Sequence, residues 1–312
     1  MGTLGTKIDA VKQLYGRQME SWPEFSVRCR ELSGVEKTSV SIDHNLYYVY
    51  FNRARQVSAR ADVSRDAIAA RPCFLCRANR PAEQERLSVA GFDLCVNPFP
   101  ITVEHFTIIH PEHTAQSIQG NVERMVELAR LLPGMAVFYN GPECGASAPD
   151  HFHFQAAPLD YFPALRPVRT KRLKLREAPG WRIILHPDMP VTPVKIEGTD
   201  IVPAVYAVLD SLPAAQGKEP MVNIMAWHDG GKDCITVFPR GAHRPASYNA
   251  GGGEGTTMFS PGAADVAGCV ITVNERDYRL MDSDRLKSLL AEVSLGKQQV
   301  DKFILDILSY AI

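Results

Sequence analysis

Residues 140–155 of the chain, NGPECGASAPDHFHFQ, decide the fold and point to a functional site. The segment follows an apolar run, Met135 to Tyr139, that is typical of a buried strand, and it starts as a loop rich in Gly and Pro. It ends in strict alternation, which predicts a second strand. Since residues i, i+2 and i+4 of a strand share a face, His151, His153 and Gln155 should point one way and two phenylalanines the other.

The two histidines have two interpretations. Histidines at i and i+2 also occur on solvated strand faces, where they carry no chemistry. Here both histidines follow a loop of small residues whose backbone N–H groups can face an anion. We therefore predict a functional site at the end of this loop.

The composition is that of a globular protein. The 312 residues are 45% hydrophobic and 22% charged, which suits one large domain or two smaller ones. A formal net charge of −1 gives no electrostatic reason to expect nucleic acid or a membrane surface as a partner. No apolar run approaches the ~20 residues that span a bilayer, and the N-terminus lacks the layout of a signal peptide. Seven cysteines, five of them scattered singly, suit a reducing cytoplasm, so we expect a cytoplasmic protein.

A Cys-x-x-Cys motif at Cys73 and Cys76 is the remaining chemical signal in the first half. Two cysteines at this spacing are either half of a metal site or a redox pair. If they bind a metal, the other ligands must come from elsewhere in the chain. Each nearby histidine is ambiguous on its own, so His105 and His110 compete with His113 for this role.

The rest of the chain alternates between helical and strand patterns, which predicts an α+β fold. Helices are expected over residues 8–22, 122–132, 202–212 and 298–311. Strands are expected over residues 46–51, 87–96, 105–109, 181–185, 191–196, 221–227, 234–238 and 269–273. A glycine run at residues 251–253 lacks the Gly-Lys-Ser/Thr ending of a phosphate loop and is interpreted as a surface loop.

The Gly-Ala-Ser loop followed by His-x-His-x-Gln resembles the histidine-triad-like (HIT-like) superfamily of nucleotidyltransferases and phosphorylases. This superfamily includes galactose-1-phosphate uridylyltransferases, diadenosine tetraphosphate phosphorylases and GDP-hexose phosphorylases. In these enzymes the second histidine of the motif attacks an α-phosphorus, which implies that His153 is the nucleophile. The resemblance implies that Gln155, Ser147 and the loop that contains Gly145 hold phosphate oxygens, with Asn140 at the start of that loop.

Further substrate contacts are implied outside the motif. The turn Asn97-Pro98-Phe99-Pro100 resembles the Asn-x-(Phe or Tyr)-Pro turn that holds base and ribose in the superfamily. Arg53 and Arg55 follow a predicted strand and could clamp a phosphate, although solvated surface explains them equally well. Arg240, at the end of a predicted hairpin, resembles the Pro-Arg ending of the phosphorylases and is expected to contact a phosphate or the acceptor.

The resemblance to galactose-1-phosphate uridylyltransferases completes the cysteine motif. It implies a structural zinc ion held by Cys73, Cys76, His113 and His151, a closed tetrahedral set that leaves no position for substrate. The ion would hold the loop that precedes the nucleophile.

The resemblance also implies the organisation of the chain. Two HIT-like units are expected, each an antiparallel sheet with flanking helices: a catalytic unit with the zinc site in residues 1–165 and a degenerate unit in residues 166–312. The sequence LLAEVSL at residues 289–295 is similar to the C-terminal end of GDP-hexose phosphorylases. Homodimers are common among such enzymes, so a homodimer is a further expectation.

The implied function is a nucleotidyltransferase or phosphorylase that acts through a covalent nucleotidyl-histidine. Its substrate would be a nucleotide sugar or a dinucleoside polyphosphate, and phosphate or a sugar 1-phosphate would accept the nucleotidyl group. Two alternatives stay open: a HIT-like hydrolase that releases the nucleotide to water, and a zinc-stabilised nucleotide-binding protein without turnover.

Overall fold

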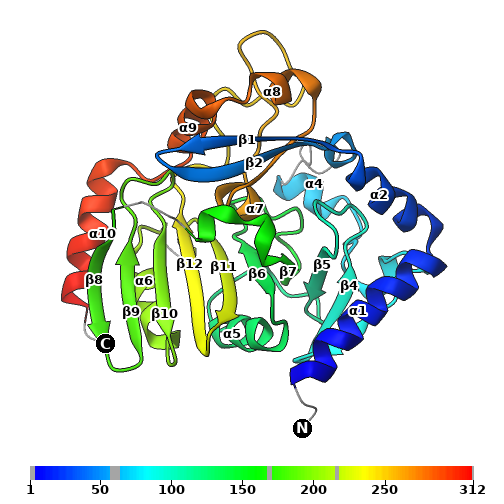
Figure 1. Ribbon diagram of the computed structural model, residues 1–312, viewed down its shortest axis with the longest axis horizontal. Coiled ribbons are helices and arrows are strands. Elements are labelled where there is room, and N and C mark those ends of the chain that lie inside the picture. Colours follow the sequence, from blue (N-terminus) through cyan, green and yellow to red (C-terminus); the bar gives the residue numbers. More distant parts are fainter. Residues whose placement is uncertain (1–3, 57–63, 167–170, 215–217, 311–312) are drawn as a thin grey trace.

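An antiparallel sheet of ten strands forms the centre of the protein, in the order β3-β4-β5-β7-β6-β11-β12-β10-β9-β8 (Figure 1). The structure is a computed structural model that describes residues 4–56, 64–166, 171–214 and 218–310. The strands of this sheet are β3 (Leu87–Val89), β4 (Phe92–Val96), β5 (Phe106–Ile109), β6 (Met135–Asn140), β7 (His153–Pro158), β8 (Leu173–Ala178), β9 (Trp181–Leu185), β10 (Val194–Gly198), β11 (Val222–Asp229) and β12 (Lys232–Pro239).

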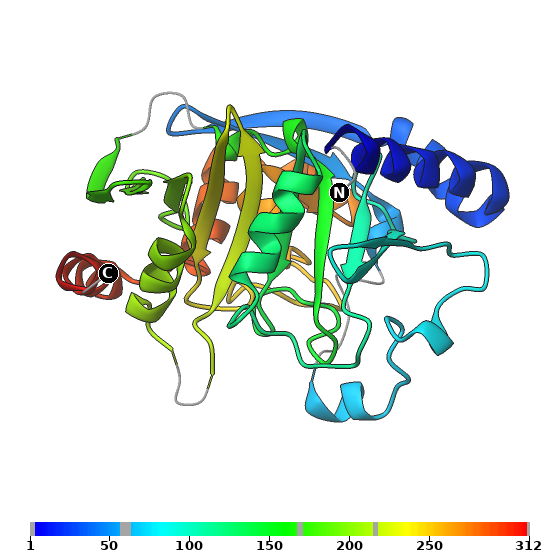
Figure 2. The ribbon, with the colours of Figure 1, turned by 90° about the horizontal axis from the view of Figure 1, so that it is seen from below.

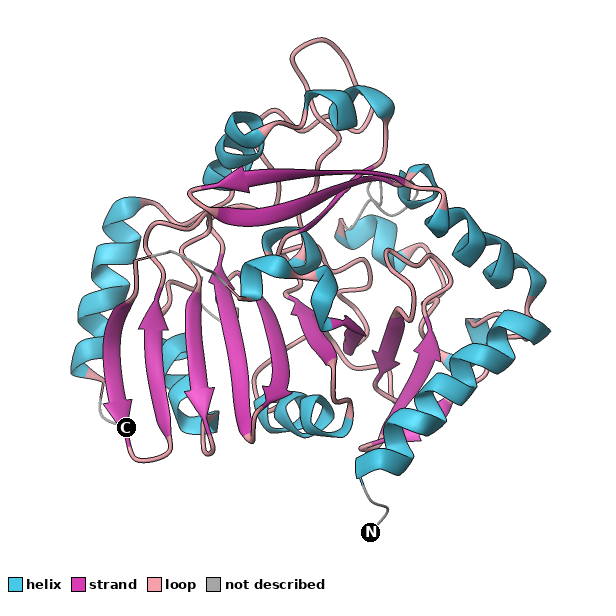
Figure 3. Ribbon diagram, in the orientation of Figure 1, coloured by secondary structure: helices cyan, strands magenta, loops and turns pink. Residues whose placement is uncertain are grey.

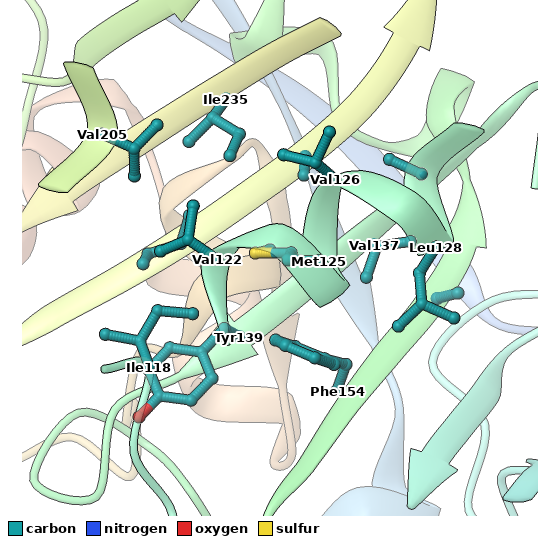
Figure 4. Close-up of a cluster of buried hydrophobic side chains, with 14 of the residues drawn as sticks. Ile118, Val122, Met125, Val126, Leu128, Val137, Tyr139, Phe154, Val205 and Ile235 are labelled. Atoms are coloured by element: carbon teal, nitrogen blue, oxygen red, sulfur yellow. The ribbon is translucent and has the colours of Figure 1, made fainter. Parts of the chain in front are cut away.

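The helices that contribute to the apolar core on one face of this sheet include α1 (Leu4–Ser21), α5 (Val122–Leu131), α6 (Val202–Ser211) and α10 (Lys297–Ser309). Figures 1 and 2 show α1 and α10 at opposite ends of the long sheet. The centre of the core lies around α5, where Val122, Met125 and Val126 pack with Tyr139 and Phe154 (Figure 4). This face is therefore fully occupied by packing and leaves the opposite face for chemistry.

A smaller sheet runs transversely past one end of the strands of the larger one (Figure 3). It consists of β1 (Glu36–Ile42), β2 (Asn45–Phe51) and β13 (Cys269–Thr272), and β13 runs parallel to β2. A second core cluster joins this sheet to the larger one through Tyr47, Phe138 and Val270. The remaining helical segments are α2 (Pro23–Ser33), η1 (Arg53–Arg55), α4 (Arg65–Ala69), η2 (Arg77–Asn79), η3 (Leu159–Tyr161), η4 (Pro163–Leu165), α7 (Ala263–Val266), α8 (Glu275–Leu280) and α9 (Ser283–Glu292).

The α+β fold predicted from the sequence is confirmed, and the differences are local. The predicted strand over residues 87–96 is a hairpin, because Ala90 and Gly91 adopt positive φ and turn the chain between β3 and β4. Strand β10 begins only at Val194, since Val191 and Thr192 also have positive φ. Strands β1 and β8 have no counterpart among the predicted strands: five of the seven residues of β1 are exposed, and β8 lies in a run of basic residues whose side chains are exposed or only partly buried.

The larger sheet is continuous across the expected boundary near residue 165, since β6 and β11 pair directly from Asn140↔Asn223 to Val137↔Ala226. The division into units 1–165 and 166–312 stays a prediction. Within the described part of the chain, every helix is too short or too polar to cross a membrane.

Candidate functional site

His153 lies at the start of β7, on the face of the larger sheet opposite α5. Its side chain is 4% exposed, and Nδ1 lies 2.9 Å from the carbonyl oxygen of His151. Because only a protonated Nδ1 can donate to a carbonyl, this contact leaves the lone pair on Nε2. Burial lowers the pKa of His153 to about 4, so the ring is neutral at pH 7. The geometry gives an imidazole with a fixed tautomer and a nucleophilic Nε2.

Gln116 holds the backbone of His153 from both sides. Its Oε1 accepts from the His153 N–H at 2.9 Å, and its Nε2 donates to the carbonyl oxygens of His153 and Asn140 at 3.0 Å. The side chain is buried and joins the ends of β6 and β7. Sequence reasoning missed this residue, because Gln116 lies in a loop without periodicity or a motif.

His105 fixes the orientation of Gln155. The Ile101 N–H donates to His105 Nδ1 at 3.2 Å, so the ring proton lies on Nε2, which donates to Gln155 Oε1 at 2.9 Å. The carbonyl oxygen of the Gln155 amide is thereby occupied, and its NH₂ group is the part left to donate to a ligand. Burial, and then the charge of Arg55, lower the pKa of His105 to about 3, which keeps this ring neutral.

Four side chains form a compact group of metal-ligating atoms beside the loop: Cys73, Cys76, His113 and His151. Their ligand atoms all lie within 4.8 Å of one another. The His151 Nδ1 is 3.4 Å from Cys73 Sγ, 3.6 Å from Cys76 Sγ and 3.3 Å from His113 Nδ1. Bonds of ~2.0–2.3 Å to a central ion place tetrahedral N and S ligands roughly 3.3–3.8 Å apart. These distances fit a four-coordinate metal ion.

The surroundings of this group orient its ligands. His151 Nε2 lies 2.8 Å from the carbonyl oxygen of His110, so Nε2 carries the proton and Nδ1 offers its lone pair to the group. Asn79 donates to the carbonyl oxygen of Cys73 at 2.9 Å and holds the cysteine turn. His113 lies in this group, whereas the alternatives His105 and His110 make other contacts and lie outside it; metal binding itself stays a prediction.

The loop between β6 and β7 is tied to the C-terminal half at Asn140. Its Oδ1 accepts from the Ala263 N–H at 2.7 Å and from Asn223 Nδ2 at 2.9 Å, and the same Nδ2 lies 2.7 Å from the carbonyl oxygen of Cys144. Gly145 has a φ of +96°, and a Cβ there would meet Gly262 Cα at 3.1 Å, so the position requires glycine. The acceptor atom of Asn140 is thus used within the protein.

Two of the expected phosphate contacts, Gly145 and Ser147, lie two residues apart in the loop between β6 and β7. Ser147 is half-buried, and its carbonyl oxygen accepts from Arg71 at 3.2 Å, which fixes the backbone beside the metal-ligating group. Gly145 lies beside the start of α7. Their contacts with a phosphate stay predictions.

The Asn97 turn and Arg55 lie next to each other. Asn97 Nδ2 donates to Thr107 Oγ1 at 3.0 Å, and Asn97 Oδ1 accepts from the Phe99 N–H at 2.9 Å. Arg55 donates to the carbonyl oxygen of Phe99 at 2.7 Å, and its charge acts on His105, so it lies near the His105–Gln155 pair. Arg53 is exposed on the same short helical turn. Arg55 is the arginine of the two that the fold brings toward the site.

Arg240 is almost completely buried, with 2% of its surface exposed. Its guanidinium donates to Asn223 Oδ1 at 2.5 Å and to four carbonyl oxygens, those of Val293, Pro261, Ala242 and His243. A guanidinium has five N–H donors, so all of them are used within the protein. The expected contact with a phosphate stays a prediction, and the geometry favours a structural role.

We predict that Arg240→Gln lowers the free energy of unfolding by about 3 kcal/mol, because the loss of the guanidinium leaves buried carbonyl groups without donors. Urea unfolding of the parent and the variant measures this difference. Arg244→Gln is the matched control: Arg244 is only partly buried, and loss of its Nε–Ser260 Oγ bond of 2.9 Å and of its contact with the Tyr248 ring at 4.1 Å should cost about 1 to 2 kcal/mol. A variant of unchanged stability that has lost phosphate binding would contradict the structural role.

Comparison with known proteins places this fold. The family model described as Domain of unknown function (DUF4922) matches residues 14–158, and no curated protein matches the sequence. The crystal structure of yeast Ap4A phosphorylase Apa2 in complex with Ap4A is similar, with a TM-score of 0.60, 13% identity, and coverage of 92% of this chain and 98% of that chain. The Apa2 complex with AMP gives a TM-score of 0.59, 14% identity, and coverage of 92% and 96%. The chain therefore shares its overall fold with yeast Ap4A phosphorylase Apa2.

Proposed function

We propose that the protein is a nucleotidyltransferase of the phosphorylase type, which cleaves a dinucleoside polyphosphate through a nucleotidyl intermediate on His153. The main observation behind this proposal is the buried, neutral imidazole of His153. Its Nδ1–H donates to the carbonyl oxygen of His151, which leaves Nε2 with a lone pair for attack. The shared fold with a phosphorylase whose crystal structures contain Ap4A and AMP supports this substrate class.

The first step is in-line attack by His153 Nε2 on the α-phosphorus. The N–P bond forms as the bond from this phosphorus to the bridging oxygen breaks, and the remaining polyphosphate leaves with the electron pair. Hydrogen-bond donors stabilise the charge on the non-bridging oxygens, and the NH₂ group of Gln155 and the N–H groups of residues 144–147 would supply them. In the second step an oxygen of inorganic phosphate attacks the same phosphorus, the N–P bond breaks, and a nucleoside diphosphate leaves.

Cys73, Cys76, His113 and His151 would hold a structural zinc ion. The donor set of two thiols and two imidazoles and its near-tetrahedral spacing suit zinc. A bound zinc ion would supply a cross-link and no reactive position. His151 is the residue through which this cross-link acts on the site, because its carbonyl oxygen holds the ring of His153.

A nucleotide sugar is the second candidate substrate. The metal-ligating group favours it, because the same cysteine and histidine order led to the resemblance to galactose-1-phosphate uridylyltransferases. A sugar 1-phosphate would then be the acceptor.

The test is to incubate the protein with Ap4A, UDP-glucose and GDP-glucose separately and to measure the intact mass. We expect a mass increase of one nucleotidyl group from Ap4A, located on His153 by peptide mapping and lost in acid, as for a phosphorus–nitrogen bond. If phosphate discharges the adduct, the protein is a phosphorylase. If a sugar 1-phosphate discharges it, the second candidate substrate is supported. Discharge by water alone indicates a hydrolase. Binding without an adduct would overturn the proposal in favour of a nucleotide-binding protein.

A further inference from the structure

A cleft of about 420 Å³ lies on the second half of the larger sheet, apart from His153. Its walls come from β9, β10, β11 and β12 and from Leu165, Arg166 and Arg172. Its volume is in the range of small-molecule sites, which typically measure ~300–1,000 Å³. The proposed reaction makes no use of it.

The strand order shows what this cleft corresponds to. The two halves of the larger sheet are related by an approximate two-fold axis between β6 and β11. In the strand order β3-β4-β5-β7-β6-β11-β12-β10-β9-β8, β7 then corresponds to β12 and β5 to β10. The helices agree, because α5 lies between β5 and β6 in the chain and α6 lies between β10 and β11.

The registers make the correspondence specific to residues. Strands β6 and β7 pair from Met135↔Pro158, and β11 and β12 pair from Val222↔Pro239. His153 lies five residues before Pro158, and Cys234 lies five residues before Pro239. Cys234 is therefore the residue of β12 that corresponds to His153 of β7. In the same way, His186 directly follows β9 as Asn97 directly follows β4.

Other positions follow the same rule and also line the cleft. Lys195 is the second residue of β10, as Thr107 is of β5. Trp227 is the sixth residue of β11 and Asn140 is the sixth residue of β6, so these two positions correspond. Since Lys195, Trp227, His186 and Cys234 all line the cleft, it is the second-half counterpart of the candidate active site.

The chemistry of the counterpart has changed. Cys234 is 6% exposed, and burial raises the pKa of its thiol to about 11, so it is a poor nucleophile at pH 7. The cleft is strongly cationic instead: its lining residues include five basic residues and only two acidic ones, Glu197 and Asp229. Glu197 lies between two of the cations, 2.6 Å from Lys195 Nζ and 2.5 Å from Arg182 Nε.

The remaining cations lie at the rim of the cleft. Arg172 and Lys232 are exposed, and Arg166 is 3.7 Å from Asp160 and 3.9 Å from Asp229. His186 reports the positive field, because burial and then the charges of Arg172 and Lys195 lower its pKa to about 4. Several guanidinium and ammonium groups around one small volume are the pattern that recognises phosphate oxygens.

We propose that this cleft binds the phosphate chain of a small molecule, either inorganic polyphosphate or the polyphosphate end of a nucleotide, and does not cleave it. It lies on β12, three strands from β7 and thus roughly 14 Å away across the same sheet. The protein then has one reactive and one non-reactive phosphate site on a common sheet.

The test is calorimetric titration of the parent and of Arg172→Gln/Lys232→Gln with inorganic tripolyphosphate. Both side chains are exposed, and the thermal midpoint of the double variant is measured beside that of the parent. We expect affinity to fall roughly ten- to a hundredfold, because two charged donors are lost. The matched control is Arg124→Gln/Lys302→Gln, which removes two exposed cations from α5 and α10 and should leave affinity unchanged. Equal affinities in the parent and the cleft variant would overturn the proposal.

Two further measurements locate the ligand and its source. Tripolyphosphate should protect Lys232 from an amine-acetylating reagent several-fold and leave Lys302 unprotected, and full labelling of Lys232 at saturating tripolyphosphate would overturn the proposal. ATP with the affinity of tripolyphosphate would indicate that the phosphate chain alone is recognised, and tighter binding of ATP would indicate a nucleotide. Binding of AMP as tight as that of tripolyphosphate would contradict recognition of a chain.

Discussion

Replacing His153 by asparagine is expected to lower the rate of nucleotidyl transfer from Ap4A by about 10⁴- to 10⁶-fold, the scale seen when a covalent nucleophile is removed. Asparagine is close in size to histidine, and its amide can still donate to the carbonyl oxygen of His151, which accepts from the imidazole at 2.9 Å. The amide nitrogen has no lone pair available for attack on phosphorus. The variant should therefore bind Ap4A, show no adduct and release no nucleoside diphosphate.

His44→Asn is the matched control for this variant. His44 is exposed, lies in the turn between β1 and β2, and has a φ of +68°, a conformation that asparagine tolerates well. The control should turn over Ap4A at the parent rate. A His153→Asn variant as fast as this control, with the parent's thermal midpoint, would remove His153 from the reaction.

Cys73→Ser should cause the largest loss of stability among the variants considered. A zinc ion contributes on the order of 10 kcal/mol in small domains that depend on it, so we expect a loss of at least ~5 kcal/mol in the free energy of unfolding. The metal content should fall from about one zinc ion per chain to nearly none. Elemental analysis by mass spectrometry, followed by urea unfolding of the parent and the variant, measures both quantities.

Cys29→Ser separates the loss of metal from the loss of a buried thiol. Cys29 is 6% exposed in α2 and lies outside the metal-ligating group. Its serine variant should lose ~1–3 kcal/mol of the free energy of unfolding, because a hydroxyl is buried in place of a thiol. It should retain the parent's metal content. Chelation of the parent should reproduce the behaviour of Cys73→Ser. A parent that contains no metal after expression with zinc, and that unfolds like Cys73→Ser, would contradict the zinc site.

The parts of the site that the sequence predicts are those fixed by spacing within one segment. Alternation in residues 151–155 predicts the strand that carries His153. Strand β7 begins two residues after His151, because the His151 N–H donates to the carbonyl oxygen of Ala148 in a turn. The set Cys73, Cys76, His113 and His151 is implied by the resemblance to galactose-1-phosphate uridylyltransferases, and the structure brings these four side chains together.

The parts that the sequence does not predict depend on contacts between distant segments. Gln116 and His105 have no pattern of their own, and they act by holding His153 and Gln155. Arg240 shows the opposite case, because its position after the predicted hairpin indicates a phosphate contact while its five donors are used by the fold. A basic side chain near a site has the same sequence signal whether it binds a ligand or carbonyl groups.

The parallel pairing of β13 with β2 sets an order for folding during synthesis. The bond from Thr272 Oγ1 to the carbonyl oxygen of Tyr50 joins residues 222 positions apart, so β2 has a free edge until almost the whole chain has left the ribosome. At ~5–20 residues per second, that edge stays open for roughly 10–40 seconds. An exposed strand edge pairs readily with other chains, so the nascent protein should depend on chaperones more than its final stability suggests.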